Sequence, residues 1–87
     1  MQVIICYDIS DNRIRYRMVK YLEQFAIRVQ YSVFKADMSE RKIKDLNSFG
    51  RYLLKDGSEG KLAVYKVAQE NLVGEELMKL PQATVII

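Results

Sequence analysis

The sequence predicts a small α+β sandwich, in which two helices cover one face of an antiparallel β-sheet. The first observation is a run of apolar, mostly β-branched residues at 3–7, which is typical of a central strand. The second is the return of apolar residues every three or four positions at 14–25 and again at 43–53, which predicts two helices. The third is strand-like composition at 27–37 and 61–67, after each of these segments.

The first strand lies within Met1 to Ser10 and ends in a carboxylate. Its residues 3–7 are apolar on both faces, so we expect a strand that is covered on both sides. Asp8 follows at the rim of the sheet, where a charge costs desolvation energy unless it is hydrogen-bonded, paired or bound to a metal. Two interpretations stay open: Asp8, Ser10 or Asp11 caps the next helix, or Asp8 has a functional role.

The first helix combines an apolar stripe with a cluster of basic residues. Its N-terminus would bring free amides and a partial positive charge to the rim beside Asp8. The basic residues follow one another without an acid between them, which suits either a solvated helix face or a surface for a polyanion. The stripe consists of Ile14, Met18, Leu22 and Phe25. The basic cluster consists of Arg13, Arg15, Arg17 and Lys20.

Residues 27–37 have the alternation of a strand with one apolar face, but they run to about twice the usual length of ~5–6 residues. They form either one long strand or two short strands joined by a tight bend. No glycine, proline or asparagine marks a turn, so both alternatives stay open.

The second half of the chain completes the pattern. Asp37 and Ser39 begin the second predicted helix, and Asp37 to Glu40 has the spacing of a capping box. A turn at 55–60, with Gly57 or Gly60 ending the helix, leads to a strand at 61–67 and a weakly helical stretch at 69–79. The apolar residues 83–87 would be an exposed edge strand unless they pair, either within the subunit or with a second copy. This order describes a ferredoxin-like sandwich (βαββαβ) with an extra C-terminal strand.

Composition limits the class of protein. The 87 residues suit one domain, 1–87, that buries only about 60–65% of its unfolded surface, which favours an oligomer. The lone Cys6 rules out a disulfide within one chain and suits a reducing cytosol. No signal-peptide pattern precedes the first strand, and no apolar stretch approaches the ~20 residues of a membrane span, so we expect a soluble, cytoplasmic protein. The net charge of +3 favours a polyanionic partner.

Two motifs resemble a known family. Tyr7-Asp-Ile-Ser-Asp11 precedes an arginine-rich helix, and Arg28-Val-Gln-Tyr-Ser-Val-Phe34 follows it. Together they resemble the CRISPR-associated Cas-two (Cas2) family of spacer-acquisition proteins, over the whole chain. The resemblance implies a two-fold homodimer in which the C-terminal strand adds to the partner's sheet. It also implies a metal-dependent nuclease acting on single-stranded RNA or double-stranded DNA, and a DNA-binding bridge between copies of the integrase Cas-one (Cas1).

The resemblance also carries roles to individual residues. It implies that Asp8 is the strand-end aspartate of the site and Tyr7 the aromatic before it. The nucleic-acid-binding positions that it implies are Arg15, Arg17, Arg28 and Phe34. The chain departs from the family at Asn12, where many members have an acid. If that acid helps to hold a metal, we expect weaker metal binding here.

A dimer would solve a chemical problem at Asp8. Mg²⁺ is normally held by one or two carboxylates, with waters and phosphate oxygens completing the octahedron. A two-fold axis would supply a second Asp8, and two such carboxylates ~4 Å apart repel by about 4 kcal/mol at an effective dielectric of 20. A divalent cation or a shared proton must then lie between them. With the cation, we expect metal-assisted phosphodiester hydrolysis. Arg17 and Arg28 would hold the phosphate, and Tyr7 or Ser10 would orient water.

A second hypothesis needs no hydrolysis. If the two carboxylates stand well apart, Asp8 is structural, while the basic surface still binds a duplex backbone without reading its sequence. The protein would then be a non-catalytic duplex-DNA-binding scaffold that bridges integrase subunits. A small-molecule regulatory domain is a remote third hypothesis, because no glycine-rich loop or other ligand signature supports it.

Overall fold

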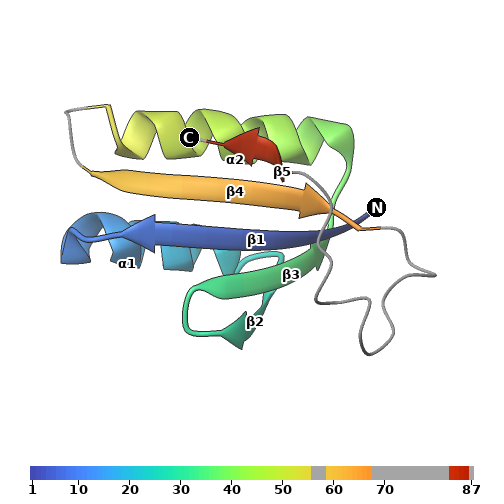
Figure 1. The fold of residues 1–87 in the computed structure, drawn as a ribbon, viewed down its shortest axis with the longest axis horizontal. Helices are drawn as coiled ribbons and strands as arrows, with labels where there is room; N and C mark the ends of the chain where they lie inside the picture. The colour runs from blue at the N-terminus through green and yellow to red at the C-terminus, as the bar shows by residue number, and fades with distance from the viewer. Residues whose placement is uncertain (56–58, 68–82, 87) are drawn as a thin grey trace.

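The computed structural model describes residues 1–55, 59–67 and 83–86, and in the last of these segments only the backbone (Figure 1). They form a five-stranded antiparallel sheet with the strand order β2-β3-β1-β4-β5, and both helices lie behind it in Figure 1. The predicted ferredoxin-like α+β class is therefore confirmed. The elements are β1 Gln2–Ile9, α1 Asn12–Leu22, β2 Ile27–Gln30, β3 Val33–Asp37, α2 Glu40–Leu53, β4 Gly60–Lys66 and β5 Ala83–Ile86.

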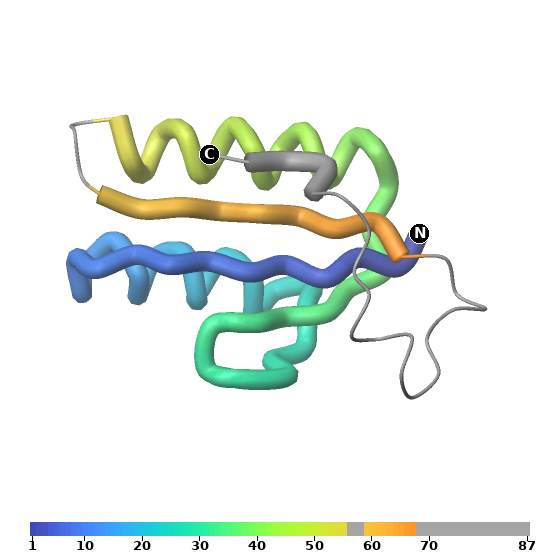
Figure 2. Tube along the Cα trace, in the orientation of Figure 1, coloured from blue at the N-terminus to red at the C-terminus, as the bar shows by residue number. Residues whose placement is uncertain are grey.

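The central strand β1 pairs with β3 on one side and β4 on the other, as the trace in Figure 2 shows. Its odd-numbered residues from Val3 to Ile9 are buried beneath the helices. On the opposite face Ile4 and Cys6 are only half-buried, and Asp8 is exposed. The expectation that β1 is covered on both sides is wrong for the single chain, because both helices pack on the same face.

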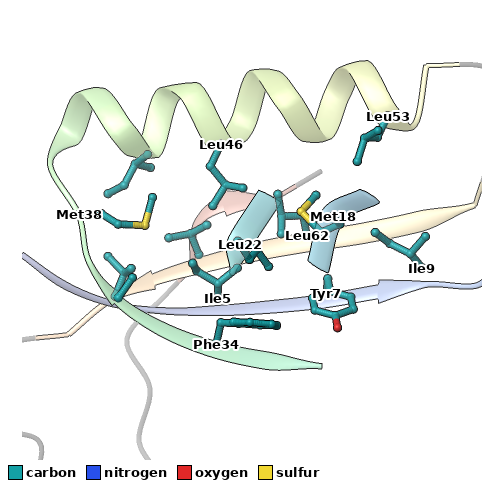
Figure 3. Packing of buried hydrophobic residues seen from close by; sticks show 14 residues of the cluster. Ile5, Tyr7, Ile9, Met18, Leu22, Phe34, Met38, Leu46, Leu53 and Leu62 are labelled. Carbon is teal, nitrogen blue, oxygen red and sulfur yellow. The ribbon is translucent and has the colours of Figure 1, made fainter. Parts of the chain in front are cut away.

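The core lies between the sheet and the two helices (Figure 3). Both apolar stripes point into it, since Met18 and Leu22 of α1 and Leu46 of α2 are fully buried. From the sheet, Ile5 and Phe34 meet them as neighbours in the β1–β3 register. The helical spacing read from the sequence is confirmed from Ile14 to Leu22 and from Ile43 to Leu53, whereas Phe25 lies beyond the end of α1.

Each helix begins at one side-chain cap. Asp11 caps α1, because its Oδ1 accepts hydrogen bonds from the backbone N–H groups of Arg13 and Ile14 at 2.9 and 3.1 Å. Ser39 caps α2 through the N–H of Lys42, so the capping box predicted at Asp37 is wrong. Asp37 ends β3 instead, and it forms an exposed ion pair with the N-terminal amine. Because Asp11 caps α1, Asp8 has no capping role.

Residues 27–37 form two strands, which decides the alternative left open by the sequence. β2 and β3 are joined by a turn at Tyr31 and Ser32. The carbonyl of Ser32 accepts the backbone N–H of Tyr7 at 3.1 Å, and the carbonyl of Tyr31 accepts the Tyr7 hydroxyl at 3.0 Å. The turn is thus held by β1, which explains why it contains no glycine, proline or asparagine.

The C-terminal strand β5 pairs with β4 of the same chain, with Ala63 opposite Ile86 and Val64 opposite Val85. Of the two alternatives that the pattern left open, the single chain shows pairing within the subunit, which differs from the addition to a partner's sheet that the resemblance implies. Gly60 begins β4, whereas Gly57 and the weakly helical stretch at 69–79 lie outside the described residues. Within the described ranges, neither helix is long and apolar enough to cross a membrane.

Candidate functional site

The end of β1, the loop that leads to α1 and the β2–β3 turn enclose a hollow of about 480 Å³. This site hollow gathers carboxylate, hydroxyl and guanidinium groups from segments far apart in the sequence. Four of the predicted site residues line it, namely Tyr7, Asp8, Ser10 and Arg15. Its complete lining is Tyr7, Asp8, Ile9, Ser10, Arg15, Tyr31 and Ser32.

A second hollow of about 290 Å³ adjoins the first and shares Tyr7, Arg15 and Tyr31 with it. We call it the side hollow. The residues that belong to it alone are Asn12, Tyr16, Val19 and Arg28. The predicted residues Arg15 and Arg28 therefore come together here, one from α1 and one from β2.

Asp8 stands on the uncovered face of the sheet, because the strand alternation that buries Tyr7 and Ile9 turns Asp8 the other way. It is exposed, and its cross-strand neighbour in the β1–β4 register is Lys61. Hydroxyl, carbonyl and carboxylate oxygens suit Mg²⁺, but one chain offers a single carboxylate here. Among the residues that the structure describes, no three acids, histidines or cysteines come together. The donors fit Mg²⁺ in kind, and the lining of the hollow supplies one carboxylate.

Cys6 lies two residues before Asp8 on the same face of β1. Burial raises the pKa of its thiol above the ordinary value. The side chain is therefore a neutral thiol near pH 7, which is a poor metal ligand and a poor nucleophile.

Tyr7 belongs to the opposite face from Asp8. Its ring is buried and lies 6.2 Å from the ring of Phe34, centroid to centroid. Its hydroxyl points away from α2 (Figure 3) and donates to the Tyr31 carbonyl. In this arrangement Tyr7 positions the turn that forms one wall of both hollows.

Arg15 holds the loop between β1 and α1. Its guanidinium donates to the carbonyl of Ile9 at 3.0 Å and to that of Ser10 at 3.5 Å. It also donates to Oδ1 of Asn12, the position where the sequence departs from the Cas2-like pattern. A carboxylate at this position would also be able to pair with Arg15.

Arg28 and Phe34 form a stacked pair. The Arg28 guanidinium carbon lies 5.2 Å from the centroid of the Phe34 ring and 6.0 Å from that of Tyr31. Phe34 is fully buried, so the expectation that it contacts nucleic acid is wrong. Its ring packs in the core, and only the exposed Arg28 above it is available to a ligand.

Arg17, like the buried Phe34, is a predicted site residue that the fold keeps apart from both hollows. It lines neither hollow and lies over the ring of Tyr52 on α2, 5.6 Å from its centroid. The residues missed by sequence reasoning are Tyr16, Tyr31 and Ser32. The absence of turn residues hid the bend at 31–32, and Tyr16 resembled an ordinary exposed helix residue.

Comparison with known proteins decides the family. The model of the family described as CRISPR associated protein Cas2 matches residues 1–73. The chain belongs to the Cas2 family. A relative from Synechocystis named CRISPR-associated endoribonuclease Cas2 is 32% identical and covers 97% of this chain, with 96% of its own length matched. A Thermus thermophilus relative named CRISPR-associated endonuclease Cas2 is 38% identical over 74% of this chain and 70% of its own.

Two solved structures support the Cas2 fold. A hypothetical protein from Thermus thermophilus superposes with a TM-score of 0.70 at 32% identity, covering 94% of this chain and 95% of its own. Cas2 from Streptococcus pyogenes superposes with a TM-score of 0.69 over 79% of this chain and 88% of its own. At 18% identity, the second likeness concerns the fold alone.

Proposed function

We propose that this Cas2-family chain is a CRISPR nuclease that hydrolyses phosphodiester bonds of RNA or DNA as a metal-dependent homodimer. The observation that carries the proposal is the placement of Asp8, an exposed carboxylate in a hollow that also contains a guanidinium group. The names of the relatives, endoribonuclease and endonuclease, agree with this chemistry.

The uncovered face of the sheet supports the dimer. In the β1–β3 and β1–β4 registers, Cys6 lies beside Val33 and Ala63, and Ile4 lies beside Tyr65, all of them half-buried. The exposed Lys35 is the neighbour of Ile4 on β3. A second copy packed on this apolar surface would remove it from water. Asp8 belongs to the same face, so a two-fold axis near the end of β1 would bring a second Asp8 toward it.

The proposed mechanism divides the work among residues of the two hollows. Asp8 and the Asp8 of the second copy would hold Mg²⁺, which polarises a phosphate and lowers the pKa of a bound water. The Ser10 hydroxyl would orient the attacking water, and Arg28 would bind the phosphate through charged hydrogen bonds. Tyr7 and Arg15 would act as positioning residues, because they hold the 31–32 turn and the loop after β1.

The direct test is cleavage of single-stranded RNA and duplex DNA by the wild type and by Asp8→Asn, with and without Mg²⁺. We expect Mg²⁺-dependent cleavage that is lost in Asp8→Asn while the circular dichroism spectrum is unchanged. Asp45→Asn makes the same chemical change at an exposed position on α2 and should cleave like the wild type. Unchanged cleavage by Asp8→Asn would refute the catalytic role.

A second candidate function is a non-catalytic scaffold that binds duplex DNA and bridges subunits of the integrase Cas1. The exposed cations Arg17 and Arg28 favour it, as does the single carboxylate that each chain offers at the site hollow. Such binding rests on phosphate contacts and falls steeply with salt.

Salt titrations of duplex affinity test the scaffold. Removing a cation that binds a phosphate lowers the slope of log K against log salt by roughly 1, so Arg17→Ala should reduce the slope. Arg41→Ala, at an exposed arginine of α2 that pairs with Asp45, should leave it unchanged. A purified protein that binds neither duplex DNA nor the integrase would exclude the scaffold. Duplex binding by a wild type that cleaves nothing would favour it over the nuclease.

A further inference from the structure

The side hollow has the composition of a nucleobase site, although the proposed hydrolysis does not need it. Three tyrosines and two arginines line it. Its volume of about 290 Å³ is near the lower end of the ~300–1,000 Å³ that is usual for small-ligand pockets. Aromatic rings beside a basic groove are the usual platform on which proteins stack the bases of single-stranded nucleic acid.

Two of the tyrosines are not needed by the core. The residues Tyr16 and Tyr31 are 61% and 71% exposed, whereas Tyr7 is buried. More than half of each residue is therefore accessible to a ligand. Their cationic neighbours strengthen the case, because Lys20 lies over Tyr16 at 5.5 Å and Arg28 over Tyr31 at 6.0 Å from the ring centroids. A base that stacks on either ring meets positive charge where its phosphates would lie.

The polar group of the side hollow can meet a base edge. Asn12 accepts from Arg15 through Oδ1, which directs its amide NH₂ to other acceptors. That group can donate to ring nitrogens or carbonyl oxygens, which every base carries. Recognition by Asn12 would therefore tolerate different sequences.

We propose that the side hollow binds one unstacked base of a single-stranded nucleic acid, next to the phosphate presented to Asp8. This inference rests on the proposed nuclease function. The two hollows share Tyr7, Arg15 and Tyr31 in their linings, so a base bound in the side hollow would lie next to the site hollow. Bases of an intact duplex are stacked on one another, and extruding one costs a few kcal/mol. Single strands and frayed ends are therefore the favoured substrate class.

The test compares affinities for a short, mixed-sequence single-stranded oligonucleotide and for its duplex, by fluorescence anisotropy in Tyr16 and Tyr31 variants. Loss of one stacking ring weakens single-strand binding by about tenfold, so Tyr16→Ala and Tyr31→Ala should each do so. Their duplex affinity should stay within about twofold of the wild type. The matched variants Tyr16→Phe and Tyr31→Phe keep the ring and should bind the single strand like the wild type. Both side chains are exposed, so all four variants should fold.

The outcomes separate this inference from the function on which it rests. Unchanged single-strand affinity in both alanine variants overturns the base site, and so does an equal loss for single strand and duplex. Neither result touches Asp8-dependent cleavage. A wild type that binds no single strand also overturns the base site, while the Asp8→Asn cleavage assay on duplex DNA decides the nuclease on its own.

Discussion

Tyr7 and Asp8 are adjacent in the chain, and strand alternation gives them opposite faces of the sheet. Tyr7 enters the core and donates its hydroxyl to the Tyr31 carbonyl, whereas Asp8 remains exposed. The sequence predicted that both residues belong to the site, and both line the site hollow. It assigned the metal to Asp8 and the orientation of water to Tyr7 or Ser10, but it did not predict that Tyr7 is buried on the opposite face from Asp8.

Removing only the Tyr7 hydroxyl tests its positioning role. Tyr7→Phe keeps the buried ring and deletes the 3.0 Å hydrogen bond to the 31–32 turn. We expect the free energy of unfolding in urea to fall by about 1 kcal/mol, with cleavage reduced only severalfold. A loss of cleavage as complete as that in Asp8→Asn would instead make the hydroxyl part of the chemistry.

Cys6 predicts a pH dependence of stability. Burial raises the pKa of its thiol in the folded chain, so the unfolded chain ionises first as pH rises past ~8.5. The contribution of this thiol to the free energy of unfolding is therefore fully present below that pH, and it is lost as the pH rises through the pKa of the folded chain. Urea unfolding between pH 7 and 10 should show a shallower alkaline decline for Cys6→Ala than for the wild type. Equal declines would contradict this account.

Among the elements, the helices were the most predictable from sequence and their caps the least. The apolar spacing at 14–25 and 43–53 predicts both helices because burial of one face decides where a helix packs, although α1 ends at Leu22. The sequence did not distinguish Asp8, Ser10 and Asp11 as caps of α1, because all three lie just before the start of the helix at Asn12. The bend at 31–32 was also hidden, because its hydrogen bonds come from Tyr7 in another strand.

The cap of α1 is tested by two alanine variants. Asp11→Ala removes the acceptor of the Arg13 and Ile14 N–H groups and should cost about 1 kcal/mol of unfolding free energy. Ser10→Ala, one residue earlier, caps nothing and should leave the urea midpoint within error of the wild type. A larger loss in Ser10→Ala than in Asp11→Ala would reverse the assignment.

At the scale of the whole molecule, one face of the sheet has no covering layer among the described residues of the single chain. The apolar character of β1 on both faces suggested two covering layers, and the helices supply one. Pattern alone does not distinguish a covering helix from a covering second chain, because both bury the same side chains. We attribute the second layer to the proposed dimer partner.

A charge placed on the uncovered face should therefore separate the dimer. Ile4→Asp sets two like charges against each other across the interface and desolvates them, so sedimentation should give a monomer with an unchanged circular dichroism spectrum. Ser48→Asp adds the same charge on the outer side of α2 and should remain dimeric. A dimer that persists in Ile4→Asp would move the interface elsewhere.

The shared use of Asp8 by two chains is tested most directly by mixing. Wild-type and Asp8→Asn chains are unfolded together, refolded and assayed for Mg²⁺-dependent cleavage as the wild-type fraction varies. If every active site needs both carboxylates, an equal mixture should retain about one quarter of the wild-type activity, because only dimers of two wild-type chains cleave. Retention of about three quarters would show that one Asp8 suffices at a shared site, and about one half that each chain's Asp8 acts independently. Full retention would contradict any role of Asp8 in cleavage.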